Sequence, residues 1–182
     1  MSQSVSFYSI SGNNFKELEK NQDPDADISH LVKNICTLNG SFMGLESTLL
    51  KDQTEEAIYI IEQIFNPSES IGGTDFSDIN IDTIDPEALE ALVMADASIY
   101  YLSPETVSDA AEVLDRISAD ELAGQYDPEE LNNNDIYPGT WHLDNSPDKA
   151  FNLPHLLQDF DSMKAFFRQA ATNKDYVLCY TG

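Results

Sequence analysis

The side chains that most often carry out chemistry in proteins are few and scattered in this chain of 182 residues. None of the three histidines, His30, His142 and His155, has a Cys, Glu or second His at the spacing that a zinc site requires. A nucleophilic thiolate needs an adjacent base or cation. Cys36 and Cys179, the two cysteines, lie instead among apolar residues, which predicts free thiols in the core. We therefore expect no bound cofactor, and enzymatic activity has no positive support.

Two acidic runs have part of the spacing of a calcium-binding loop, in which alternate acids supply oxygen ligands. In residues 78–89, however, Thr83 and Leu89 stand where such a loop needs a glycine and a bidentate glutamate. Residues 23–34 depart from the pattern at the same two positions. Both runs are better explained as helix-capping acids on the surface, so no metal site is expected.

Net charge is the most unusual property of the chain. It has 33 acidic residues against nine Lys and Arg, which gives a formal charge of −24 and a pI near 4.1. From Asp52 to Asp148 the only cation is Arg116, although this stretch holds 24 of the 33 acids. Such a potential repels nucleic acid and anionic membranes and accelerates encounter with basic proteins. A surface adapted only for solubility explains the same composition equally well.

If the charge is directed at a partner, the contacts should come from acids on turns and helix starts, where the chain is exposed. Seven residues meet this description: Asp75, Asp78, Asp82, Glu87, Glu90, Glu129 and Glu130. We expect them to bind a basic protein.

The segment NNNDIYPGTW, residues 132–141, raises a second possibility. Asparagine tolerates the left-handed conformation that ends a helix, and Pro-Gly favours a turn, so a structural corner is the preferred interpretation. Aromatic residues on an ordered loop also make good contact anchors. A ligand-binding cleft would then be lined by Tyr100, Tyr101, Tyr137, Trp141 and His142.

Alternation and helical spacing predict a single α+β domain over residues 1–182, with a small mixed β-sheet covered by several helices. Strands are expected near 4–11, 97–102 and 175–181, with a further short strand at 76–81. Helices are expected over 13–21, 23–38, 53–65 and 152–174, and after the caps at Ser103-Pro104, Ser118 and Asp127-Pro128. Another helix should begin at Asp85-Pro86, whereas 39–48 and 66–75 lack a regular pattern.

The second half of the chain resembles the YfbM-like bacterial family, a domain of unknown function. The resemblance is strongest over residues 97–182 and is carried by Tyr-Leu-Ser-Pro-Glu at 101–105, by Ile-Tyr-Pro-Gly at 136–139 and by the final helix and strand. Residues 44–65 depart from it, because they lack the family's Asp-Lys-x-Trp and Thr-Gly motifs. The resemblance implies an α+β fold and no particular reaction.

Three hypotheses about function follow. The first is an acidic bacterial binding or inhibitor protein, specifically an immunity protein that neutralises a basic, secreted toxin. The second is a small-molecule-binding protein or an enzyme that uses the aromatic cleft, and the third is a DNA mimic. No basic leader with an apolar core and no run of about 18 apolar residues occurs, so a cytoplasmic location without membrane contact is expected.

Overall fold

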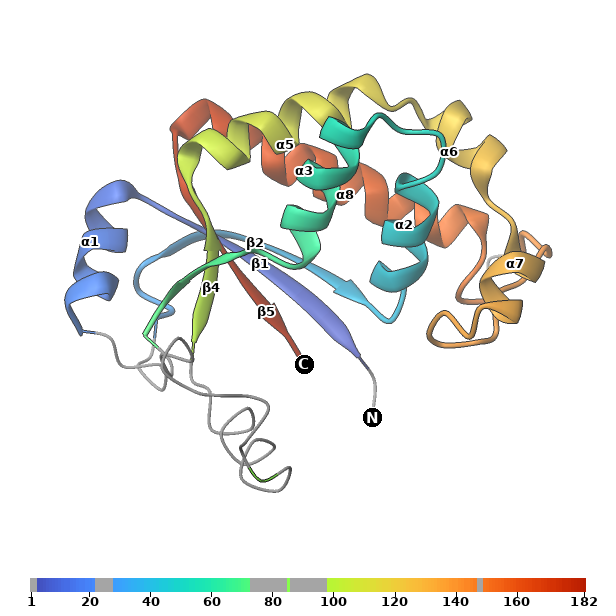
Figure 1. Cartoon of the computed structure of the whole chain (residues 1–182), viewed down its shortest axis with the longest axis horizontal. Helices are drawn as coiled ribbons and strands as arrows, with labels where there is room; N and C mark the ends of the chain where they lie inside the picture. The colour runs from blue at the N-terminus through green and yellow to red at the C-terminus, as the bar shows by residue number, and fades with distance from the viewer. Residues whose placement is uncertain (1–2, 22–27, 73–84, 86–97, 147–148) are drawn as a thin grey trace.

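One antiparallel sheet of five strands, in the order β2-β1-β5-β4-β3, forms the base of the molecule (Figure 1). The computed structural model describes residues 3–21, 28–72, 85, 98–146 and 149–182. The strands are β1 (Ser4–Ile10), β2 (Val32–Asn39), β3 (Glu69–Ile71), β4 (Ile99–Leu102) and β5 (Tyr176–Thr181). Alternate residues of β1, such as Val5 and Phe7, are fully buried, as expected for a strand with one face on a helical layer.

Most of the helices lie over one face of this sheet (Figure 1). The described helices are α1 (Gly12–Asn21), α2 (Phe42–Leu49), α3 (Glu55–Phe65), α5 (Pro104–Arg116), α6 (Ala119–Gln125), α7 (Pro128–Asn133) and α8 (Leu153–Asn173). α8 has 21 residues and is therefore about 31 Å long, enough to cross the sheet. Its buried Phe167 meets Phe7 of β1 edge-on at 5.5 Å, which joins the helical layer to the main core.

α1 covers part of the opposite face of the sheet, where a second, smaller core forms. Phe15 of α1 stacks on Tyr176 of β5, with ring centroids 3.8 Å apart and an interplanar angle of 9°. Leu18 and Ile10 complete this cluster with apolar residues of β3, β4 and β5. The sheet is therefore buried on both faces at the α1 end.

The α+β fold class is confirmed, and so are the expected strands at both ends of the chain and near residue 100. The described strands all pair antiparallel, although the sequence had suggested a mixed sheet. The caps are confirmed as well. Ser103 and Ser118 accept hydrogen bonds from the backbone N–H groups of Thr106 and Glu121, and Asp127 caps α7.

Three expectations were wrong. Residues 32–39 form β2 and not the end of a helix, because alternate residues Cys36 and Leu38 enter the core while the backbone pairs with β1. The stretch near Gly44, which lacks a regular pattern, contains helix α2, and the short strand β3 lies within the expected loop after residue 65. The strand expected at 76–81 and the helix expected from residue 85 fall outside the described residues.

No helix in the described part of the chain combines the length and apolar character needed to cross a membrane.

Candidate functional site

α3 and α5 present rows of acids on the outer surface of the helical layer. The two helices pack against each other (Figure 1). Exposed residues recur on each with the spacing i, i+4, i+7, which keeps them on one side of a helix. The rows are Glu55, Tyr59 and Glu62 on α3, and Glu105, Asp109 and Glu112 on α5. This face has the high density of negative charge that the composition predicts, but its acids are other than the seven expected on turns and helix starts.

A shallow groove of about 110 Å³ runs between these helices. Buried side chains, Ile60 of α3 and Val113 of α5, form its apolar floor, and Glu56 and Asp109 stand at its rim. Arg116 also borders the groove, but it is bound to Glu112 within its own helix. The groove can therefore accept a long basic side chain, with its aliphatic part on the floor and its charge among the rim carboxylates.

Tyr59 is the exposed aromatic residue on this acidic face, with 57% of its surface accessible. It lies one turn after Glu55 and about one turn before Glu62, so carboxylates flank it along α3. An exposed tyrosine combines a large apolar surface with a hydroxyl group, and tyrosine is enriched at the energetic centres of interfaces. Tyr59 is the residue of this surface most suited to anchor a partner.

The pKa of Glu46 indicates how closely the carboxylates crowd around α3. Glu46 belongs to α2, and burial raises its pKa above the ordinary value. The negative charge of Glu62 raises it further, whereas a hydrogen bond from the Asn66 side chain lowers it. The charge of Glu62 therefore adds to the burial of Glu46, and both disfavour ionisation of the Glu46 carboxyl.

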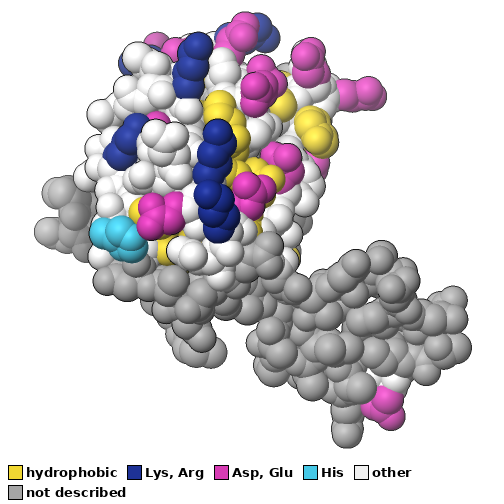
Figure 2. Space-filling model, turned by 90° about the vertical axis from the view of Figure 1, so that its left-hand side faces the viewer, with side chains coloured by type: hydrophobic (Ala, Val, Ile, Leu, Met, Phe, Trp, Pro, Cys, Tyr) yellow, Lys and Arg dark blue, Asp and Glu magenta, His cyan; other side chains and the backbone are white. Residues whose placement is uncertain are grey.

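The nine cations do little to neutralise this surface. Five of them form ion pairs: Lys33, Lys51, Arg116, Lys149 and Arg168. Lys164 donates to the backbone carbonyls of Asp115 and Ile117. Lys and Arg side chains gather with several acids on the face at the α1 end of the molecule (Figure 2). Among α3 and α5, Arg116 is the one cation, and Glu112 already neutralises it.

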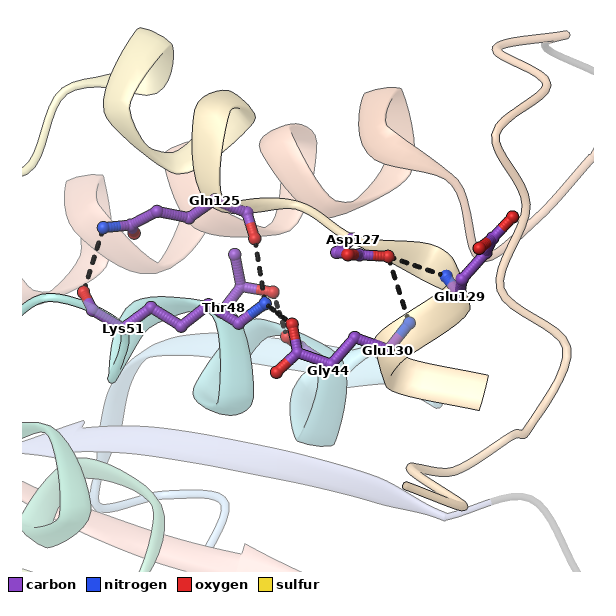
Figure 3. Close-up of polar contacts among 7 residues, drawn as sticks. All are labelled: Gly44, Thr48, Lys51, Gln125, Asp127, Glu129 and Glu130. Atoms are coloured by element: carbon purple, nitrogen blue, oxygen red, sulfur yellow. Dashed lines mark hydrogen bonds and ion pairs between the residues drawn. The ribbon is translucent and has the colours of Figure 1, made fainter. Parts of the chain in front are cut away.

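Two of the seven acids selected from the sequence, Glu129 and Glu130, lie in the described structure, in the first turn of α7. Glu130 is already engaged, because Lys51 donates to its Oε2 at 2.5 Å (Figure 3). Glu129 is exposed, and its carboxylate points away from this network (Figure 3). Lys51 also donates to the backbone carbonyl of Gln125, so the network ties α7 and α6 to the end of α2. Asp75, Asp78, Asp82, Glu87 and Glu90 fall outside the described residues.

The five residues of the expected aromatic cleft lie in separate places. Tyr100 and Tyr101 are neighbours on β4, so their side chains leave opposite faces of the sheet. Tyr100 lines a pocket of about 480 Å³ with Phe65 and Cys179 on the helical side. Tyr101 packs edge-on against Phe15 of α1, with ring centroids 4.7 Å apart. The remaining three residues, Tyr137, Trp141 and His142, belong to the loop before α8.

Within that loop, Trp141 is a core residue with 3% of its surface accessible. Its backbone N–H donates to the side-chain carbonyl of Asn132 at 2.8 Å, and the Asn132 amide donates back to the Trp141 carbonyl at 2.9 Å. The indole N–H donates to the Ile136 carbonyl at 3.0 Å. Because every polar group of Trp141 is satisfied internally, this segment has the contacts of a structural corner.

One cluster, Ser41, His155 and Asp159, has the residue types of a hydrolase triad. The order of contacts differs from a triad, in which histidine lies between serine and the acid. Here the hydroxyl of Ser41 donates to Asp159, and His155 Nε2 is 3.7 Å from the same carboxylate. Ser41 is fully buried, and burial raises the pKa of Asp159 above its usual range. The cluster therefore holds the start of α2 on α8, and the Ser41 hydroxyl is bonded to a carboxylate and not to the imidazole of His155.

The fold and this surface define a class: a single-sheet α+β protein with an acidic helical layer and, among its described residues, no group of three or more potential ligands placed to hold a metal ion. The chain belongs to the family described as a domain of unknown function, DUF1877, whose model matches residues 1–180. It is also similar in fold to YfbM of Escherichia coli, a protein of unknown function. That structure matches with a TM-score of 0.63 and 14% sequence identity over 100% of both chains. No curated protein matches the sequence.

Proposed function

We propose that this protein binds and neutralises a basic protein, and that the partner is a secreted bacterial toxin against which it confers immunity. The observation that carries the proposal is the groove between α3 and α5, with exposed carboxylates at its rim. The exposed Tyr59 lies on the outer side of α3. Complementary charge on a basic partner would accelerate association, and Tyr59 would supply a desolvated anchor.

The internal contacts support this surface over the alternatives. Glu130 is neutralised by Lys51, and Trp141 is buried in the core, so neither residue is suited to make the main contacts with a partner. Glu55, Glu56 and Glu62, by contrast, are exposed in the first turn and on the outer side of α3. A toxin that acts on nucleic acid presents basic residues to its substrate, and such residues would meet this face.

The test begins with the immobilised full-length chain and a lysate of the native host at low salt. Retained proteins are identified by mass spectrometry, and the association rate of each purified candidate is measured at increasing salt. We expect a basic partner whose association slows steeply with salt and with the triple reversal Glu55→Lys, Glu62→Lys and Asp109→Lys. Reversal of exposed acids elsewhere, Glu17→Lys, Glu19→Lys and Asp161→Lys, is the matched control and should have a much smaller effect.

A toxicity assay then separates immunity from simple binding. Co-expression with the partner should protect cells, and the triple reversal should abolish that protection while the control triple retains it. Retention of DNA-binding proteins that duplex DNA displaces would indicate a DNA mimic instead. A partner that binds wild type and the triple reversal equally would overturn the proposed surface.

A further inference from the structure

The outer edge of β2 faces an open groove, in contrast to the protected centre of the sheet. β2 is an end strand, and among the described strands none pairs with its outer side. Four consecutive residues, 34–37, line a groove of about 400 Å³ between β2 and α8. Alternate side chains of a strand point to opposite faces, so four consecutive lining residues mean that the groove follows the strand's edge.

This edge has little of the protection that usually prevents pairing with another chain. Edge strands are commonly blocked by proline, by charged side chains or by a bulge. β2 has one charged residue, Lys33, at the position of an irregularity in the pairing between Ser9 and Ile10 of β1, and Lys33 is bound to the buried Asp175. Beyond it, residues 34–39 are uncharged, and Ile35 exposes 60% of its surface.

The helical wall of the same groove is also uncharged. The exposed residues of α8 that continue this wall recur with spacings of four and three: Gln158, Ser162, Ala165, Gln169 and Thr172. The other exposed side of the helix bears charges, including Asp161 and Arg168. On a molecule with a net charge of −24, an uncharged strand edge beside an uncharged helix face is a surface where two copies can meet without direct repulsion.

We propose that this surface binds a second copy of the chain, with β2 pairing antiparallel to β2 of the other copy across a two-fold axis. α8 and β2 run in opposite directions, because Ser41 at the end of β2 contacts Asp159 and Lys33 near its start contacts Asp175. The two-fold axis therefore places the start of one α8 beside the end of the other, so that the two helix dipoles run in opposite directions, which is favourable. The two sheets become one continuous ten-stranded sheet, and Ile35 is buried.

The spacing of the elements is compatible with this pairing. Neighbouring strands lie about 4.8 Å apart. A helix that lies above β1 and β2 in each copy would then be about 10 Å from its counterpart, the usual distance between packed helices. Ser162 and Ala165 are small enough for that approach.

Sedimentation equilibrium of the full chain, whose mass is 20.3 kDa, tests the proposal. We expect a reversible dimer whose dissociation constant rises at least about 100-fold in Ile35→Lys, since two like charges then face each other across the axis. Leu143→Lys is the matched control, because Leu143 is also an exposed aliphatic residue, 71% accessible, and is not among the residues that line the groove. Its association should equal that of wild type.

If Ile35→Lys does not fold, a second variant, Ser162→Glu, tests the same interface from the exposed side of α8. It should also dissociate the dimer. Higher salt should strengthen the dimer of two acidic chains, whereas it should weaken the complex with a basic partner, so the two proposals fail independently. A wild-type chain that remains monomeric at all concentrations and salts, or a dimer that both folded variants leave intact, would overturn the inference.

Discussion

Trp141 lies directly on the backbone of Gly44, so closely that a Cβ atom added to Gly44 would be 2.2 Å from the indole ring. This contact joins the loop before α8 to the middle of α2. It also explains why a glycine occurs inside a helix, where glycine costs about 1 kcal/mol relative to alanine.

Gly44→Ala should therefore destabilise the protein by about 2 kcal/mol, because the indole is buried and cannot move away without disturbing the core. Gly124→Ala in α6 is the matched control. No atom lies within 4 Å of a Cβ at that position, so the variant should be neutral or more stable by up to about 1 kcal/mol. Urea unfolding followed by tryptophan fluorescence measures both. Equal stability of the two variants would show that Trp141 does not rest on α2 in solution.

Removal of the Lys33 side chain should destabilise the protein, because it leaves the buried carboxylate of Asp175 without its ion-pair partner. Asp175 is 1% accessible, its Oδ1 accepts from Lys33 at 2.5 Å, and its Oδ2 has no partner among the described residues. Lys33→Ala should cost about 2 kcal/mol, less than for a fully buried pair because the lysine is partly exposed. Lys16→Ala on α1 is the control and should change the free energy of unfolding by less than about 0.5 kcal/mol. An unaffected Lys33→Ala would mean that Asp175 is satisfied in another way.

Protonation of Glu46 should stabilise the folded protein as the pH falls towards 4.5. The folded-state pKa of Glu46 is raised above its unfolded value of 4.5, first by burial and then by Glu62, so the folded protein takes up this proton first. The resulting gain begins as the pH falls through the folded pKa and is complete below the unfolded one. Glu46→Gln retains the acceptor for Asn66 and should show a smaller gain over this range. Parallel pH profiles of wild type and Glu46→Gln in thermal unfolding would contradict the assignment.

Both thiols should be unreactive in the folded protein. Burial and the nearby charge of Asp159 raise the pKa of Cys36 to about 11, and burial raises that of Cys179 to about 12. At pH 8 almost no thiolate forms, so Ellman's reagent should modify neither residue in native buffer and both in denaturant. Rapid labelling of one native thiol would place that residue at an accessible surface.

Charge reversal on α3 and α5 should leave the fold intact. Glu55→Lys, Glu62→Lys and Asp109→Lys change exposed positions and reduce the self-repulsion of a chain with charge −24. We expect an unchanged or higher melting temperature, most clearly at low salt, where screening is weakest. A large decrease would mean that these carboxylates make structural contacts, and a loss of binding by the same variant could then not be assigned to the surface.

Features that depend on a few adjacent residues were predictable. Ser103-Pro104, Ser118 and Asp127-Pro128 start helices as expected, because capping involves atoms within about one turn of the chain. The amphipathic spacing of α5 and α8 was also sufficient, since each helix has one strongly apolar side. The rows of exposed acids on α3 and α5 could have been found by the same spacing if it had been applied to charged residues.

β2 and the aromatic residues required long-range information. Residues 28–35 carry apolar side chains at helical spacing, while Cys36 and Leu38 alternate, and the pairing of Thr37 with Ser6 of β1 decides in favour of a strand. The direction in which Tyr100 and Tyr101 point follows from the placement of β4 beside β5. Composition determines that the domain is strongly acidic and folded, and the spacing of apolar residues indicates an α+β fold, because charge and periodicity are local properties. Contacts between segments distant in the chain decide which acids face outward together. They also decide whether Trp141 lies in the core or on the surface as a contact for a partner. These contacts form only when the sheet and its helices assemble.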